Sequence, residues 1–539
     1  MIDEVRARLA RRGIAPPEER LTRIAAEVAA IHDGVARAGA LLEPSDSPWT
    51  PPREENAPAA APTGTARPDR AARAVDSSEI AWLSAAELGR RIRDGAVSPV
   101  EVVRSLLARI DALDGALNCY VAIDGDRALE AAETSERELS AGNWRGPLHG
   151  VPMALKDIYD TAGMATCVGS DFLRHRVPDR DAFSVTRLRQ AGAILLGKLN
   201  MHEFAYGLTS DNPHFGPTRN PWDRERVPGG SSGGSAAALA AGLCHISLGT
   251  DTGASIRLPA AVCGVVGFKP TFGRVSRTGV FPLSWSLDHV GPMARSVEDA
   301  ALVYDAIVSH DPNDPWCARA SVAPTVPHLQ AGIAGCRVGV PRRHFYERLA
   351  PDVERVTDAA LDVLRSLGAT IVEVDCSIAA DIVPIVLAII GAEASDVHAE
   401  WLAAHPERYG ADVRHRLETG AALDALDYAR AQRLHRRVAQ RIVAAMADVD
   451  VMVTPTVPRT APRFGEVISR EPTVAWNRLV SPFNVSGQPA LSLPCGFGDD
   501  GTPLGLQIVG RPFDEATVLR VGAAYERATE RHRHRPALA

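Results

Sequence analysis

The chain has 539 residues, 45% of them hydrophobic, and a net charge of −7. This composition is typical of a globular protein with a large core, and the charge gives no reason to expect nucleic acid or an acidic membrane surface as a partner. No apolar run approaches the roughly 20 residues that cross a bilayer, and the N-terminus lacks the apolar core of a signal sequence. The eight cysteines are scattered without a C-x-x-C pair, so we predict neither a metal site nor a disulfide framework, and we expect a cytoplasmic protein.

Residues 1–42 are predicted to form two helices, separated near Gly13 and Pro16. In the second helix, apolar residues recur at spacings of three and four and form one stripe: Leu21, Ile24, Val28, Ile31 and Val35. Two interpretations stay open. The helix docks on the rest of its own chain, or it binds a partner or a second copy in a homodimer.

Residues 43–78 are predicted to be a linker. Seven prolines lie between Pro44 and Pro68, among Ala, Thr, Glu and Arg. Such a segment cannot bury enough apolar surface to fold alone, so we expect an extended or disordered chain there.

The globular body is predicted to occupy residues 79–539. Capping boxes at Ser84 and Ser98 begin its first helices. Short apolar runs such as 193–196 and 338–340 then alternate with helical segments, of which 352–367 and 427–446 are long, and 449–455 has the pattern of a buried strand. This alternation predicts an α/β layered architecture.

Two loops rich in glycine and serine, 228–235 and 249–259, flank one segment of small residues. Glycines let main-chain N–H groups approach a ligand closely, and serine hydroxyls beside such groups are what acyl transfer needs. A flexible linker is the alternative, but the alanine-rich run from 236 to 241 is a strong helix former. The pattern G-x-S-x-G at 230–234 lacks the buried strand that a nucleophile elbow requires.

A serine nucleophile needs a base, and no Asp–His pair is found near these serines. Lys156 closes a short apolar run, where burial would lower the pKa of its ammonium. Lys198, in a near match to a phosphate loop, is predicted to be ordinary because its surroundings have the pattern of a strand. His202 and His214 are not spaced from another His or Cys as metal ligands are, so we predict no metal site there.

Together these segments resemble the amidase signature family. The resemblance rests on Gly150–Asp157, Gly197–Phe204, Phe215–Trp222, Pro228–Ser235, Gly249–Pro259, Cys263–Thr271, Ser286–Pro292, Val453–Thr456 and Gly505–Gly510, and it spans roughly residues 80–530. It implies one catalytic domain with a large mixed β-sheet covered by helices on both faces, preceded by an extra helical segment.

The resemblance also implies roles for single residues. Ser255 matches the nucleophile of the family, Ser231 the bridging serine that follows a cis peptide bond, and Lys156 the base. The backbone N–H groups of Thr252, Gly253, Ala254 and Ser255 match the oxyanion hole. Ala254 stands where the family has a second glycine, so a positive φ there would mean strain.

Other residues of these loops are expected to support the site. Asp251 and Arg257 flank the nucleophile and are expected to form an ion pair, while Ser232 and Ser235 either donate to the site or cap a helix.

The resemblance implies hydrolysis of a small carboxylic amide through an acyl-enzyme, without metal or cofactor, and with side activity on esters, anilides or carbamates. Two alternatives remain. The chain is also similar to the A subunit of glutamine-dependent aminoacyl-tRNA amidotransferases, and residues 1–42 distantly resemble the small accessory subunits of some family members. The second alternative is a non-catalytic scaffold. The loops 164–185, 310–350 and 380–480 are expected to build the substrate pocket, with these candidate aromatics: Tyr206, Phe281, Trp285, Trp401 and Trp476.

Overall fold

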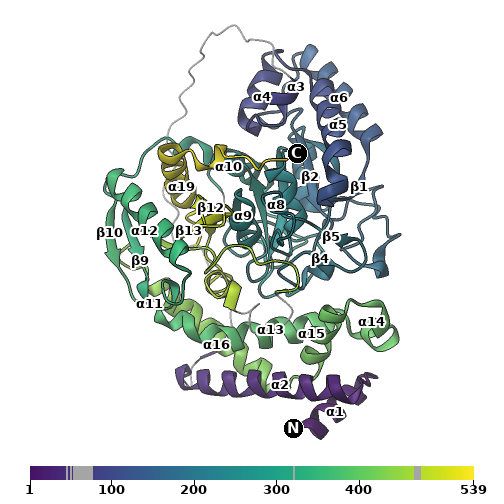
Figure 1. The fold of residues 1–539 in the computed structure, drawn as a ribbon, viewed down its shortest axis with the longest axis vertical. Helices are drawn as coiled ribbons and strands as arrows, with labels where there is room; N and C mark the ends of the chain where they lie inside the picture. Colours follow the sequence, from purple (N-terminus) through teal and green to yellow (C-terminus); the bar gives the residue numbers. More distant parts are fainter. Residues whose placement is uncertain (44–45, 49–50, 52–76, 320–321, 467–474, 539) are drawn as a thin grey trace.

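The structure is a computed structural model that describes residues 1–43, 46–48, 51, 77–319, 322–466 and 475–538. Most of the predicted linker therefore lies outside the described residues. Within these ranges the centre of the protein is an eleven-stranded mixed sheet, with a separate two-stranded sheet beside it (Figure 1). This arrangement confirms the predicted α/β fold.

The strands of the large sheet follow the spatial order β1-β3-β2-β6-β8-β7-β12-β13-β11-β9-β10. Their bounds are Tyr120–Ile123 (β1), Pro152–Lys156 (β2), Ile194–Leu199 (β3), Ile246–Asp251 (β6), Val266–Lys269 (β7), His289–Ala294 (β8), Arg337–Val340 (β9), Thr370–Glu373 (β10), Val451–Pro455 (β11), Ala490–Phe497 (β12) and Pro503–Gly510 (β13); the small sheet pairs Asp211–Asn212 (β4) with Gly216–Pro217 (β5). The pairs β3–β2, β2–β6, β11–β9 and β9–β10 are parallel and the others antiparallel.

Helices cover both faces of this sheet. Their bounds are Ile2–Arg11 (α1), Glu18–Ala38 (α2), Ser77–Ile80 (α3), Ala85–Arg93 (α4), Pro99–Leu117 (α5), Gly125–Ser140 (α6), Phe183–Gln190 (α7), Gly233–Ala240 (α8), Arg257–Cys263 (α9), Val297–Ile307 (α10), Arg342–Phe345 (α11), Pro351–Ser366 (α12), Ile382–Val397 (α13), Ala399–Ala404 (α14), Ala411–Ala421 (α15), Ala425–Ala444 (α16), Pro482–Val485 (α18) and Glu515–Thr529 (α19). In one layer α8 contacts α9. In the other layer α10 contacts α7 and α19, and α19 contacts α12. Because both faces are covered, β3, β6 and β8 are buried along their whole length.

The capping signals in the sequence begin helices as predicted. Ser84 Oγ accepts a hydrogen bond from Glu87 N (3.1 Å) at the start of α4. Ser98 Oγ accepts from Val100 N (3.1 Å) at the start of α5, whose first residue is Pro99. These bonds satisfy backbone donors that have no partner inside the helix.

The N-terminal helices dock on the chain's own helical layer. Helix α2 packs against α13, α15 and α16 (Figure 1). The side chains of its apolar stripe are buried there. Polar contacts reinforce the docking, because Arg20 lies 2.7 Å from Glu418 and His32 2.9 Å from Asp427. Gly34 lies so close to Pro384 that a Cβ there would come within 2.5 Å of the proline ring. The second helix is therefore a docked helix, as the first interpretation expects.

One helical stretch among the described residues, Ser377–Val397, is long and apolar enough to cross a membrane by length and composition alone. Its most apolar run in the sequence, 382–392, is too short by itself, so no span was predicted. Half of the most apolar window of the helical stretch is buried, and α13 packs against α2, α15 and α16. The core helix of a soluble protein has the same properties, so this stretch is weak support for a membrane span.

Replacing Ile24 with alanine is expected to destabilise the whole body. Ile24 has no exposed surface, and truncating such a side chain costs about 2–5 kcal/mol. Urea denaturation measures the loss, and hydrogen exchange of residues 382–397 shows whether α13 becomes exposed. Arg23→Ala, an exposed neighbour, is the control and should change stability by less than about 0.5 kcal/mol. Unchanged exchange in α13 would mean that α2 does not protect it.

Candidate active site

The predicted site lies where two parallel strands end. Strands β2 and β6 are neighbours in the sheet, with Leu155 opposite Leu248. Their carboxyl ends therefore meet at one edge, the usual place for a site in such sheets. Lys156 is the last residue of β2, and β6 runs through Asp251 into the loop that carries Ser255.

Lys156 and Ser231 are brought into direct contact. Lys156 Nζ lies 2.7 Å from Ser231 Oγ and 2.7 Å from Thr250 Oγ1. Lys156 and Ser231 have no exposed surface, and the Gly230–Ser231 peptide bond is cis. Burial lowers the pKa of Lys156 to about 7, against the opposing effect of the negative charges of Asp251 and Asp288. A substantial fraction of the amine is therefore neutral near pH 7 and able to accept a proton.

Ser255 lies beside the loop that carries Ser231. The carbonyl oxygen of Ser255 accepts a hydrogen bond from Ser232 N (3.3 Å), which ties the two serine loops together. Ser255 is 4% exposed. Among the described residues its hydroxyl has no hydrogen-bond partner, so no structural hydrogen bond occupies it.

The loop before Ser255 offers unused backbone donors. Among the described residues, no N–H group from 252 to 255 donates a hydrogen bond. Buried N–H groups are nearly always paired, so four consecutive free ones indicate a place for an anionic ligand atom. Ala254 does not have a positive φ. Its methyl group therefore adds no backbone strain, and the departure from the family pattern is conformationally neutral.

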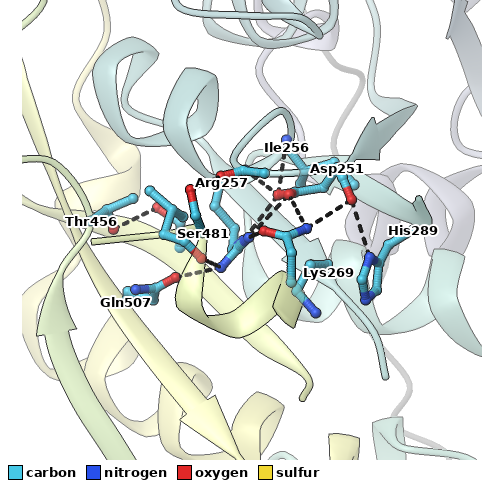
Figure 2. Close-up of polar contacts among 12 residues, drawn as sticks. Asp251, Ile256, Arg257, Lys269, His289, Thr456, Ser481 and Gln507 are labelled. Carbon is cyan, nitrogen blue, oxygen red and sulfur yellow. Dashed lines mark hydrogen bonds and ion pairs between the residues drawn. The ribbon is translucent and has the colours of Figure 1, made fainter. Parts of the chain in front are cut away.

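A buried ion pair holds this loop in place, as predicted from the sequence. Arg257 Nε lies 2.9 Å from an Asp251 carboxylate oxygen, and the guanidinium also donates to Gln507 Oε1 (2.8 Å) and Asn484 Oδ1 (2.6 Å). Figure 2 shows Arg257 between Asp251 and Gln507, with Ser481 beside it. Burial acts to raise the pKa of Asp251, but the charge and hydrogen bonds of Arg257 outweigh it and hold that pKa well below its usual range.

Ser232 and Ser235 do not cap the helix that follows them. Helix α8 has no side-chain cap bond. The two hydroxyls donate instead to carbonyl groups of β6, Ser232 to Thr250 (3.3 Å) and Ser235 to Leu248 (3.4 Å). Both serines therefore fasten the serine loop to the strand that leads to Ser255.

Asp288 is a site residue that was not predicted from the sequence. Its carboxylate accepts a hydrogen bond from Thr252 Oγ1 (2.6 Å) and from the backbone N–H groups of Leu283 (2.9 Å) and Ser284 (3.0 Å). Burial raises the pKa of Asp288, although these donors oppose it. The only signal in the sequence was its place inside a matching motif, Ser286–Pro292.

Glu393 on α13 fixes the same segment from the helical layer. It accepts from Ser284 Oγ (2.6 Å), Ser286 N (3.1 Å) and Tyr428 OH (2.9 Å). Nothing in the sequence near Glu393 indicated this contact. The loop that holds Thr252 through Asp288 is thus supported by an element more than 100 residues later.

A cavity of about 130 Å³ is lined in part by Thr250, whose Oγ1 lies 2.7 Å from Lys156 Nζ. Thr250 and Thr252 contribute to its wall, and Val280, Phe281 and Trp285 make much of the rest apolar. Residues 277–290 supply most of its lining, rather than the loops expected to do so.

The other candidate aromatics lie elsewhere. Trp476 is buried in the core. Trp401 stacks on Phe172 and on Phe281 and so supports the cavity wall from behind. Tyr206 lies under the Arg416 guanidinium, 5.8 Å from the ring centre.

Two further lysines are buried in the region. Lys198 donates to Tyr159 O and Thr166 Oγ1, and burial lowers its pKa to about 8. Lys269 donates to Gln488 O and Pro270 O. Of these three buried lysines, Lys156 is the one that bonds a serine hydroxyl in the hydrogen bonds of the described residues.

The histidines in the motifs serve structure. His214 lies 2.7 Å from Glu203, and His202 lies 2.9 Å from Asp412. The second pair connects the body to the start of α15, where Glu203 also accepts a hydrogen bond from Gly410 N (2.8 Å). The described residues contain no group of His, Cys, Asp or Glu that could hold a metal ion.

A neutral lysine on a serine hydroxyl, beside free backbone N–H groups, is an arrangement suited to acyl transfer. The family model described as Amidase matches residues 101–519. The chain therefore belongs to the amidase family.

Relatives of two kinds are similar to the chain. An amidase of Pseudomonas putida is 43% identical over 86% of this chain and 99% of its own length. The A subunit of the glutamyl-tRNA(Gln) amidotransferase of Moorella thermoacetica is 40% identical over 85% of this chain and 99% of its own length. The chain is similar to both kinds of protein to nearly the same degree.

Solved structures confirm the fold. A protein described as part of a vestigial complex at the origin of an s-triazine catabolic enzyme has a TM-score of 0.79, with 37% identity over 83% of this chain and 99% of that chain. The peptide amidase of Stenotrophomonas maltophilia has a TM-score of 0.74, with 33% identity over 84% and 98%. Family and neighbours together indicate a hydrolase of carbon–nitrogen bonds.

Proposed function

We propose that the chain hydrolyses small linear carboxylic amides, with Ser255 as nucleophile, Ser231 as proton relay and Lys156 as base. The observation that carries this proposal is the 2.7 Å contact between Lys156 Nζ and Ser231 Oγ in a fully buried setting. A scaffold without catalysis would have no need to hold a buried amine of lowered pKa against a serine hydroxyl, whereas the buried amines of Lys198 and Lys269 bond to no serine among the described residues.

The proposed reaction proceeds in two halves. Ser255 Oγ attacks the amide carbonyl carbon and passes its proton to Ser231, which passes its own proton to neutral Lys156. The four free N–H groups of 252–255 hold the oxyanion. The C–N bond then breaks, and the amine leaves after receiving the proton from Lys156 through Ser231. Water attacks the acyl-enzyme by the same route, releasing the acid and restoring Ser255.

The cavity favours an apolar or aryl acyl group over glutamine. Two charged groups of its wall are already engaged, Arg277 with Asp314 (3.3 Å) and Asp288 with Thr252 (2.6 Å). The charged amino and carboxyl groups of glutamine would need partners there, and unpaired charges in such a space are costly. Anilides, aryl amides and related esters or carbamates meet apolar walls formed by Phe281 and Trp285 instead.

The experiment compares substrates on the purified chain alone. We expect turnover of an anilide and an aliphatic amide to exceed glutaminase activity by at least about tenfold, since a buried unpaired charge costs more than about 1.4 kcal/mol. Phe281→Asp should reverse part of this preference, and Tyr206→Phe, outside the cavity, should leave it unchanged. Glutaminase as the dominant activity would favour the amidotransferase alternative, and no labelling of any serine by an acyl probe would favour the scaffold.

The proposal includes a cytoplasmic location and no organic cofactor. All eight cysteines are free and buried, which suits a reducing compartment. The docked helices α1 and α2 already cover the helical layer of the body, which supports a chain that works without a separate helper.

A further inference from the structure

A second pocket lies at the far end of the strand that borders the active site. Strand β8 begins at His289, opposite Asp251, and ends at Ala294. Arg295 and Ser296, which follow it, line a cavity of about 360 Å³. A strand of this length extends roughly 20 Å, so this pocket is separate from the catalytic one.

Three arginines, two of which line this pocket, gather around the Trp82 ring. The guanidinium carbons of Arg535, Arg109 and Arg295 lie 4.5, 5.0 and 6.0 Å from the centre of the Trp82 ring. Arg295 is 9% exposed and donates to backbone carbonyls, including Leu83 O (2.7 Å). Arg535 and Arg295 line the cavity, together with Arg533.

This positive charge has no matching carboxylate. Among the described residues, no carboxylate oxygen lies within 4.0 Å of the guanidinium groups of Arg109, Arg295 or Arg535. Glu87 lines the pocket, but its carboxylate is bound to Arg90 (2.9 Å) and Arg91 (2.7 Å).

Other ionisable groups of the pocket do not offset the positive charge of these arginines. Arg533 is paired with Glu530 (3.0 Å). Burial raises the pKa of Glu526, which lies 3.9 Å from His532, to about 8, so this carboxyl group is largely neutral near pH 7. Burial lowers the pKa of His532 to about 4, so His532 adds no positive charge either.

Gathering like charges in a partly buried place costs free energy unless an anion offsets it. Burial and the charges of neighbouring arginines lower the pKa of Arg109 and of Arg295, in the second case against the opposing charge of Asp299. A bound anion would remove this repulsion, and arginine is suited to carboxylate and phosphate because its N–H donors match their geometry.

We propose that the pocket lined by Trp82, Arg295 and Arg535 binds a small planar organic anion, a carboxylate or a phosphate ester. Trp82 and Trp222 supply flat apolar surface for the body of the ligand. Arg295 and Arg535 hold its anionic group. The volume of about 360 Å³ falls in the range of ordinary small-molecule sites.

The test uses calorimetry on the full chain with three probes. Benzoate and phenyl phosphate carry the anion, and benzamide is the neutral analogue. To separate this pocket from the catalytic site, binding is compared between the wild-type chain and variants of the pocket. We expect saturable binding of at least one anion, weaker at high salt because exposed charges are screened. The tighter of the two anions identifies the ligand class.

Arg535→Gln should weaken that binding by about tenfold or more, the usual effect of losing a charged hydrogen bond. Arg535→Lys should restore part of it by keeping the charge. Arg531→Gln makes the same change in charge on the same segment, outside the lining, and should have no effect. Amide hydrolysis should be unchanged in all three variants. Three results would overturn the proposal. Neither anion binds, benzamide binds as tightly as the anions, or Arg531→Gln weakens binding of the anion as much as Arg535→Gln does.

Discussion

Replacing Ser255 with alanine is expected to reduce kcat/KM for an anilide by about 10⁴- to 10⁶-fold, as removal of a serine nucleophile does in other hydrolases. The variant keeps the free N–H groups of 252–255 and the contact between Lys156 and Ser231. It should therefore bind substrate and remain folded, because Ser255 makes no side-chain hydrogen bond among the described residues. Steady-state kinetics and a covalent acyl probe measure the two effects.

Ser235→Ala is the matched control for this variant. Ser235 is also a buried serine of the glycine-rich loops, but its hydroxyl donates to Leu248 O (3.4 Å) rather than to a group of the proposed relay. We expect a loss of stability of about 1 kcal/mol and little loss of turnover. Equal activity in Ser255→Ala and wild type would show that another group carries out the attack.

The pH profile should report the ionisation of Lys156. Because the proposed mechanism uses Lys156 in its neutral form, kcat/KM should rise about tenfold per pH unit below pH 7 and level off above it. Lys156→Met, similar in volume but without an amine, should lose turnover by about 10³-fold or more and lose this limb of the profile. A profile of the residual activity that still bends near pH 7 would assign the ionisation to another residue.

Asp288→Asn tests one of the charges that oppose the lowering of the pKa of Lys156 by burial. The negative charge of Asp288 stabilises the ammonium form of Lys156, so removing it lowers the pKa further. The rising limb should therefore move to lower pH, a change that loss of packing alone would not produce. Asp314→Asn removes another buried carboxylate of the same region, one paired with Arg277, and should leave the limb in place.

Most residues of the candidate site could be predicted from the sequence because they lie in short local motifs. Ser231 and Ser255 lie in glycine-rich loops, and the unpaired N–H groups of 252–255 belong to one short segment. Asp251 and Arg257 are six residues apart, so their ion pair was also predictable. Such arrangements depend on backbone geometry over a few residues, which composition and spacing specify.

For the lysine, composition and spacing gave only a weak signal, and the prediction of Lys156 came from the family resemblance. Lys156, Lys198 and Lys269 are all buried at or near strand ends. Only the packing of β2 beside β6 shows which amine reaches a serine. The pKa of Lys156 depends further on Asp288, which no nearby motif connects to it.

By itself, then, the sequence determined the family, the α/β fold and the residues of the serine loops, because each rests on short-range patterns. Only the tertiary structure decided that Asp288 and Glu393 support the loop that carries Thr252, that α2 docks on α13, and that the C-terminal Arg535 meets Trp82. These contacts join segments that are far apart in the chain. They arise from burial and charge in three dimensions, for which one sequence carries no local signal.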